Sequence, residues 1–242
     1  MGQQLLVLPD SVQQMHLTHG VMDDFYEYTT GGKFSSVLTD SGTIAVSDAV
    51  GGVATLTPSD GTVADNDEAY LKQTNEVFLF AANKPIVAES RIKFTELSTN
   101  KANVMFGFKD AVAANTILDD GGGPPASYSG AVFFKVDGDT TWNAESSDST
   151  TQKTTTLTSD VSLDKATKTS GGGVWQILRI TAIPTGDGLI DFQFEIDGVL
   201  VAVHKNRSYA NATEMQAFVG VKNGSANNQT VLVDYIRCHQ SR

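Results

Sequence analysis

Polar residues that alternate along one segment are the first candidates for catalysis. In LIDFQFEID (189–197), Asp191, Gln193, Glu195 and Asp197 alternate with apolar residues, so they would share one face of a β-strand. Alternate residues on such a face lie about 6.5–7 Å apart, which suits the two carboxylates of an inverting glycosidase. A solvent-exposed face that ends in an Asp-Gly turn explains the same pattern without any activity. We favour this second interpretation.

Nucleophilic catalysis has little support in the sequence. The Gly-x-Ser-x-Gly motif is absent, and no spacing connects any of the four histidines to a particular serine. Cys238 and His239 are neighbours on a predicted strand, where they would point to opposite faces. We therefore expect Cys238 to be a small, packed side chain, and we predict that the protein is not an enzyme.

Loop carboxylates are the remaining candidates for a metal site. Asp137 and Asp139 flank a glycine, and further Asp and Asn residues occur at 65–67 and 119–120. Calcium prefers such oxygen donors, but none of these segments has the spacing of a known calcium loop, and the same residues are common in turns. His16 and His19 have no third zinc ligand nearby. We predict no metal cofactor and keep Asp137 and Asp139 as weak calcium candidates.

Two aromatic residues could bind a sugar. Trp142 and Tyr128 lie on either side of a strand and close to the glycine-rich segment 119–125, where their rings could stack on a glycan. Packing in the core is the alternative for both, and we favour it. We expect Trp175 to be a core residue.

Composition excludes several classes of partner. The chain has 242 residues, one cysteine and a net charge of −11. A nucleic-acid surface needs a basic field, and so does binding to an anionic membrane. One cysteine cannot form an internal disulfide. We expect no signal peptide and no transmembrane span, because the short apolar run near the N-terminus ends at Pro9.

The elements that must position these residues are short strands. Segment 174–204 alternates over its whole length and predicts three consecutive antiparallel strands. Residues 43–48 and 52–57 form a predicted hairpin. Further strands are expected at 68–73, 76–81, 86–97, 103–110, 130–138, 154–158, 215–223 and 229–238, and at most one short helix, near 111–118. About a dozen strands with almost no helix predict an all-β, two-sheet antiparallel sandwich.

The N-terminal residues 1–22 are set apart from the single sandwich domain predicted for 23–242. They form either an edge strand with a loop or an arm that docks on a neighbouring subunit. In the second case Leu5, Leu6, Val7 and Leu8 would make the contact, since their apolar surface is hard to place in the sandwich.

The second half resembles the concanavalin A-like, or laminin G-like, sandwich family. The resemblance rests on Val174-Trp175-Gln176, on the Asp-Gly turn at 195–198, on Val-Asp-Tyr-Ile at 233–236, and on the strands at 106–110 and 130–144. It implies a jelly-roll fold, and calcium is a common ligand of laminin G-type sandwiches. Glycosidases of this type carry Glu-x-Asp-x-x-Glu, which segment 191–197 does not match. The composition also resembles that of tailed-bacteriophage virion proteins.

Two functions follow as hypotheses. The first is a non-enzymatic capsid decoration (cement) protein. It would bind the major capsid protein or other virion subunits on the capsid surface, as a homotrimer assembled in the host cytoplasm, with weak contacts that act together. The alternative is a carbohydrate-binding, lectin-like module of a phage tail or bacterial enzyme, which would use Trp142 and Tyr128. An active polysaccharide hydrolase or lyase, with Glu195 and Asp197 in a cleft, is a third hypothesis.

Overall fold

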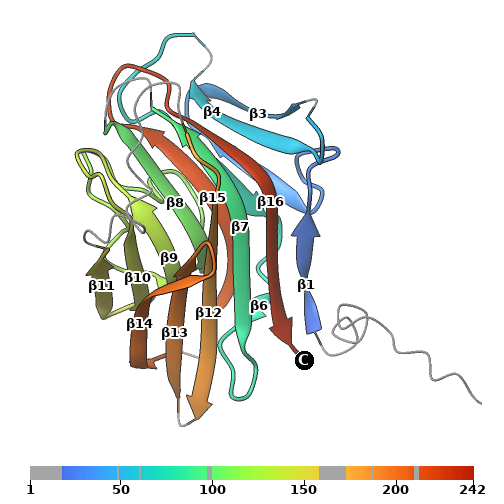
Figure 1. Ribbon diagram of the computed structural model, residues 1–242, viewed down its shortest axis with the longest axis vertical. Coiled ribbons are helices and arrows are strands. Elements are labelled where there is room, and N and C mark those ends of the chain that lie inside the picture. Colours follow the sequence, from blue (N-terminus) through green and yellow to red (C-terminus); the bar gives the residue numbers. More distant parts are fainter. Residues whose placement is uncertain are drawn as a thin grey trace, which may run out of the picture.

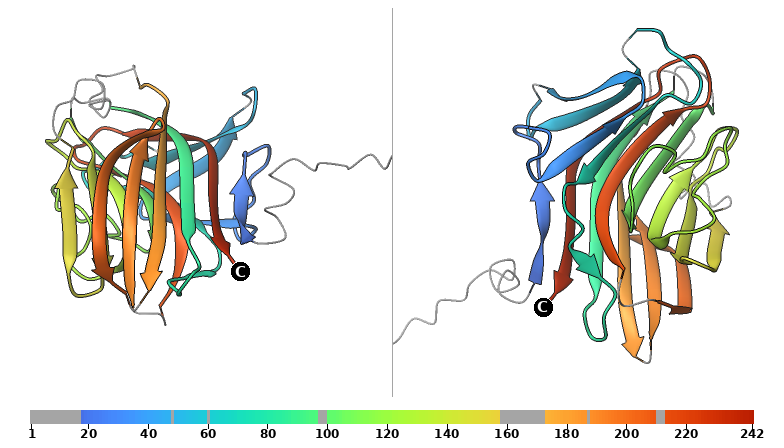
Figure 2. Two further views of the ribbon diagram at one scale, coloured as in Figure 1. Left: turned by 60° about the horizontal axis from the view of Figure 1, so that its bottom comes forward. Right: turned by 180° about the vertical axis from the view of Figure 1, so that it is seen from behind.

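The computed structural model describes residues 18–47, 49–59, 61–96, 100–157, 173–186, 188–209 and 213–242. These residues form sixteen β-strands in two antiparallel sheets, which make two curved layers in Figures 1 and 2. The described part of the chain contains no helix that could span a membrane.

We call the first layer sheet A. Its strands run in the order β14-β13-β12-β7-β16-β4-β3, and β1 pairs with β16 beside the C-terminus (Figure 1). The bounds of its strands are Thr18–Asp23 (β1), Ser41–Ser47 (β3), Val53–Ser59 (β4), Ile86–Thr95 (β7), Gln176–Gly186 (β12), Leu189–Ile196 (β13), Val199–Ser208 (β14) and Thr230–Ser241 (β16).

The second layer, sheet B, has the order β11-β10-β9-β8-β15-β5-β2, and β6 pairs with β15. The bounds of its strands are Phe34–Leu38 (β2), Glu68–Gln73 (β5), Phe78–Leu79 (β6), Ala102–Lys109 (β8), Ser129–Lys135 (β9), Asn143–Asp148 (β10), Gln152–Thr156 (β11) and Glu214–Asn223 (β15).

The main core lies between the sheets. Alternate side chains of each strand point inward, as a period of two requires. On β13 these are Ile190, Phe192, Phe194 and Ile196, and on β8 they include Phe106 and Phe108. Cys238 on β16 belongs to the same core and is fully buried, which raises the pKa of its thiol.

A second, smaller core covers the other face of sheet B. There Tyr70 on β5, Met105 on β8 and Phe218 on β15 pack against Val112 and Ile117 of the loop between β8 and β9. Because this loop lies on the sheet, every residue of β8 and of β9 is buried. The loop is therefore a third layer that positions polar residues at the end of the sheet.

The sequence predicted most of this architecture. The all-β sandwich is confirmed, as are the three strands of segment 174–204, now β12, β13 and β14, and the hairpin β3–β4. Residues 18–22 are part of β1 and pair with β16, which fits the first of the two alternatives for the N-terminal segment, an edge strand. The sequence allowed at most one short helix, near 111–118, and the structure has a turn there. Thr116 caps a turn at Ala113, and Asn115 has a φ of 60°, which interrupts a right-handed helix.

Candidate functional site: a cluster of polar loops

Five loop segments meet at one end of sheet B, at the top of Figure 1, where β15 ends and β8 begins. We call residues 64–67, 100–103, 119–123, 136–139 and 223–227 the loop cluster. Backbone hydrogen bonds join these segments: the N–H groups of Asn66, Gly224 and Gly138 donate to the carbonyls of Asn223, Lys101 and Asn100, at 3.0, 2.8 and 2.8 Å.

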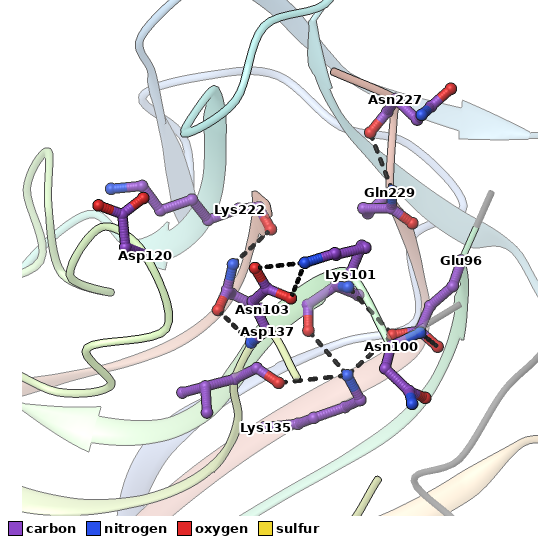
Figure 3. A network of polar contacts seen from close by, with 12 residues as sticks. Glu96, Asn100, Lys101, Asn103, Asp120, Lys135, Asp137, Lys222, Asn227 and Gln229 are labelled. Carbon is purple, nitrogen blue, oxygen red and sulfur yellow. Dashed lines mark hydrogen bonds and ion pairs between the residues drawn. The ribbon is translucent and has the colours of Figure 1, made fainter. Parts of the chain in front are cut away.

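Side chains add to these connections. The amide oxygen of Asn103 accepts from the backbone N–H of Asp137 at 2.7 Å, and Asn103 also donates to the carbonyl of Lys222. In Figure 3, Asn103 lies between Asp137 and Lys222. One buried asparagine therefore fixes two loops relative to the end of β15.

The backbone of the loop cluster is strained. Asn66, Asn100 and Asp120 have positive φ values of 69°, 57° and 53°. Asparagine and aspartate tolerate this region better than other residues with a Cβ, but the conformation still has a cost. Such strain concentrates at ligand sites, where the surrounding structure imposes it. Three such residues lie on three of the five loops, where they meet exposed carboxylates, and we take this end of the molecule as the candidate site.

Several polar groups of the cluster face solvent. Asp65 and Asp120 are exposed, and the side chain of Asp119 is 54% exposed. The ammonium of Lys101 contacts both carboxylate oxygens of Asp137, at 2.8 and 3.0 Å, and this contact raises the pKa of Lys101. The cluster thus presents carboxylates and an ammonium side by side, and such groups can accept and donate hydrogen bonds to a polyhydroxylated ligand.

Two polar atoms in the loop cluster lack a protein partner. Asn100 Oδ1 and Ser225 Oγ are buried and have no hydrogen-bond partner among the residues that the structure describes. Buried polar atoms are nearly always satisfied by protein, water or ligand. These two atoms mark positions where a bound hydroxyl or a water molecule would be stabilised.

A fully buried ion pair supports the cluster from within the sandwich. Lys135 Nζ on β9 lies 2.8 Å from Glu96 Oε1, just after β7, and both side chains are completely buried. The same ammonium donates to the carbonyl of Ala102 at 3.0 Å, and Glu96 accepts from the backbone N–H groups of Asn100 and Ala102 (Figure 3). Burial lowers the pKa of Lys135. This pair connects sheet A with sheet B directly beneath the loops.

The two aromatic residues proposed as a sugar platform are not on the surface. Trp142 and Tyr128 are each 1% exposed. The indole of Trp142 packs edge-on against Phe94 and donates to Gln176 Oε1 at 3.2 Å. The hydroxyl of Tyr128 donates to Glu145 Oε1 at 3.0 Å. Neither ring can stack on a glycan in this structure, and both act in packing.

Trp175, in contrast, was expected in the core and lies on the outer face of sheet A. The guanidinium of Arg91 lies 4.6 Å from the centre of its ring, within the range of a cation–π contact. Trp175 shares its strand face with Ile177 and Arg179, which are half-buried, whereas Leu178 and Ile180 point into the core.

The two carboxylates considered for a glycosidase, and not favoured, make structural contacts. Glu195 lies on the outer face of sheet A, 3.5 Å from Arg179 Nη1. Asp197 is in the β13–β14 turn, where its carboxylate accepts from the backbone N–H of Ile177 at 2.8 Å. Neither side chain lies in the loop cluster.

A serine–histidine contact was not predicted from the sequence. Ser146 Oγ lies 2.8 Å from His204 Nδ1, and Thr155 Oγ1 lies 3.0 Å from His204 Nε2. His204 is fully buried, and burial lowers its pKa to about 4. A substrate cannot reach this serine, so the contact joins strands and does not form a nucleophile.

The weak calcium candidates are used in other contacts. Asp137 pairs with Lys101, and Asp139 accepts from Asn143 Nδ2 at 3.2 Å. Within the described ranges, no three His, Cys, Asp or Glu side chains are grouped closely enough to hold a metal ion.

The predicted arm residues Leu5, Leu6, Val7 and Leu8 lie outside the described residues.

Sequence reasoning found part of the loop cluster. It singled out segments 65–67, 119–120 and 137–139 for their carboxylates, and the structure brings all three together. It missed Lys101, Asn103 and Lys222, since single lysines and asparagines near strand ends carry no distinctive pattern.

Comparison with known proteins shows similarity in structure alone. No protein-family profile matches the sequence, and no curated protein sequence matches it. The carbohydrate recognition domain of Emp47p is similar, with a TM-score of 0.59 and 11% identity over 94% of this chain and 98% of that one. Endo-β-1,4-glucuronan lyase from the fungus Trichoderma reesei has a TM-score of 0.58 and 11% identity, over 90% and 94% of the two chains.

The potassium-bound carbohydrate recognition domain of Emp46p has a TM-score of 0.52 and 13% identity, over 89% and 94% of the two chains. Identities this low show a shared fold and nothing more about this chain. The protein has the concanavalin A-like, lectin-like jelly-roll sandwich.

Proposed function

We propose that the protein is a carbohydrate-recognition module that binds glycan hydroxyl groups through the loop cluster. The observation that carries the proposal is the meeting of Asn66, Asn100 and Asp120, which have positive φ values, with exposed carboxylates on two of the loops, 64–67 and 119–123. Loops held by a rigid scaffold are the usual place for binding residues. Carboxylate and amide groups suit sugar hydroxyls because each hydroxyl both donates and accepts a hydrogen bond.

The similar structures support this proposal over a role on a capsid. Those named above are two carbohydrate recognition domains and a glucuronan lyase. They give no support to a capsid decoration role. Binding to a virion subunit and assembly as a homotrimer stay predictions of the sequence, and they would be tested by deleting residues 1–17.

The binding mode differs from the one predicted from the sequence. Trp142 and Tyr128 are buried, so recognition would depend on hydrogen bonds from the loops and not on stacking against these two rings. We expect weak affinity for a single sugar, with a Kd on the order of 1 mM, which corresponds to about 4 kcal/mol. Clustered sugars on a surface would bind more tightly through several copies of the protein.

A glycan array followed by calorimetry would test the proposal. Asp120→Asn removes a charge from the loop cluster but keeps a residue that tolerates the positive φ at this position. It should weaken binding at least several-fold. Glu214→Gln is the matched control, because it removes an exposed charge at the far end of β15. Equal binding by the two variants, or no sugar binding at all by the unmodified protein, would refute the assignment.

A further inference from the structure

One lysine of sheet B is surrounded by oxygen atoms of the loop between β8 and β9. Lys222 on β15 has a side chain that is 1% exposed. Its ammonium donates to Asn115 Oδ1 at 2.7 Å and to the carbonyl of Ile117 at 2.9 Å. It also forms ion pairs with Glu68 Oε2 at 3.3 Å and with Asp119 Oδ1. Three of these four residues belong to the loop.

The oxygen atoms around Lys222 are of the kind that a hard cation takes as ligands. Two carboxylates, one amide and one backbone carbonyl make a set that suits a metal ion such as calcium. Here, however, the centre of the set is occupied by Nζ of Lys222, which the protein itself supplies. The Emp46p domain, which has the same fold, has a potassium-bound form. The residues of this chain do not leave room for an ion at this position.

Two further lysines form ion pairs with carboxylates close to Lys222. Lys101 Nζ lies 2.8 Å from Asp137, and Lys135 Nζ lies 2.8 Å from Glu96 (Figure 3). Asp137, Glu96 and Asp119 are therefore paired with lysines that come from β9 and β15 or, for Lys101, from the residue directly before β8.

Sheet B also holds the backbone of this loop next to Lys222. The N–H of Asn115 donates to Glu68 Oε1 at 2.8 Å, and the N–H of Ile117 donates to the hydroxyl of Tyr70 at 3.0 Å. Tyr70 in turn donates to Glu68 Oε2 at 2.6 Å. Removal of the ammonium would leave Glu68 buried without its cation, and an unpaired buried charge is strongly unfavourable. The two loop N–H groups would then lose a well-positioned acceptor.

We infer that the Lys222 ammonium takes the place of a bound metal ion and holds the loop between β8 and β9 against sheet B. The loop conformation is then independent of metal ions. If the loop cluster binds glycans as proposed above, that binding also resists chelators. The claim that Lys222 holds the loop against sheet B does not depend on sugar binding, and it can be tested without a sugar.

Hydrogen exchange of the Asn115 and Ile117 amides gives a direct readout. In the unmodified protein we expect the same exchange rates in EDTA and with added potassium or calcium. In Lys222→Ala these amides should exchange about tenfold to a hundredfold faster, as expected for the loss of hydrogen bonds to a charged group. Added potassium or ammonium ions should restore part of the protection, because the oxygen atoms around the vacated position can bind a free cation.

Lys72→Ala is the matched control, since Lys72 lies on the same face of sheet B, two residues from Tyr70 on β5. It should leave the two amides unchanged in every salt. Faster exchange in EDTA for the unmodified protein would overturn the inference, and that measurement needs no variant. Unchanged exchange in Lys222→Ala, or no response of this variant to added cations, would also overturn it. If the protein bound no glycan, the proposed function would be refuted and the inference about Lys222 would be unaffected.

Discussion

Acidification should weaken the sandwich through one buried histidine, His204. This residue lies on β14 of sheet A, and its ring contacts Ser146 on β10 and Thr155 on β11 of sheet B. Its ring centre also lies 5.0 Å from that of Phe194. The imidazole therefore joins the two layers where the edges of both sheets meet.

The size of the effect follows from the pKa. Burial lowers the pKa of His204 from 6.5 to about 4, and the nearby Lys153 and Arg207 act in the same direction. The unfolded chain takes up a proton near pH 6.5, whereas the folded protein takes it up only near pH 4. Between these values the unfolded state binds more protons, so the free energy of unfolding falls as the pH falls. A pKa difference of about 2.5 corresponds to a loss of about 3 kcal/mol below pH 4.

Urea unfolding at several pH values between 7 and 4 would measure this loss. His204→Gln cannot titrate, so its free energy of unfolding should depend less on pH in this range. His239→Gln is a second variant: His239 is half-buried on β16, outside the contact between the sheet edges, and its pKa is also lowered, so this variant should remove its own, separate share of the pH dependence. A direct check is the pH titration of the imidazole by NMR. A midpoint near pH 6.5 in the folded protein, or the same pH dependence in His204→Gln, would refute the reasoning.

Three further predictions concern buried residues of the two sheets and of the core between them. Lys135→Met should lower the free energy of unfolding by about 3–5 kcal/mol, because Glu96 would remain buried without a partner; adding Glu96→Gln should recover part of this loss in urea unfolding. Gly220→Ala would place a Cβ 2.1 Å from the ring of Tyr70, and it should cost about 1–3 kcal/mol in thermal unfolding. Trp142→Ala should cost about 3–5 kcal/mol yet leave the sugar Kd of the folded protein unchanged by calorimetry, since the ring is buried.

The fold was predictable because its signal is local. Strict alternation at 189–197 fixes which side chains of β13 point inward, and the hairpin turn at 197–198 fixes its connection to β14. A second alternation, at 174–182, also contained the answer for Trp175, which directly precedes β12 and points the same way as the half-buried Arg179. The burial of Trp142 was harder to predict, because this residue directly precedes β10 and its immediate neighbours in the sequence are polar.

The loop cluster was only partly predictable because its contacts are long-range. The contact between Lys222 and Asn115 spans 107 residues, and Asn103 reaches Asp137 across 34. Loop carboxylates are visible in the sequence, but the lysines that neutralise them come from strands that only the folded topology brings near. Asp137, a weak calcium candidate in the sequence, is paired in the structure with the ammonium of Lys101.

The burial of Cys238 has a practical consequence. It is the single cysteine of the chain, it lies at zero exposure within the main core, and burial raises the pKa of its thiol. The reactive thiolate is therefore absent from the surface at neutral pH. A cysteine introduced on any exposed strand would be the sole target for maleimide reagents, so fluorophores or spin labels could be attached at one chosen point without first removing the native residue.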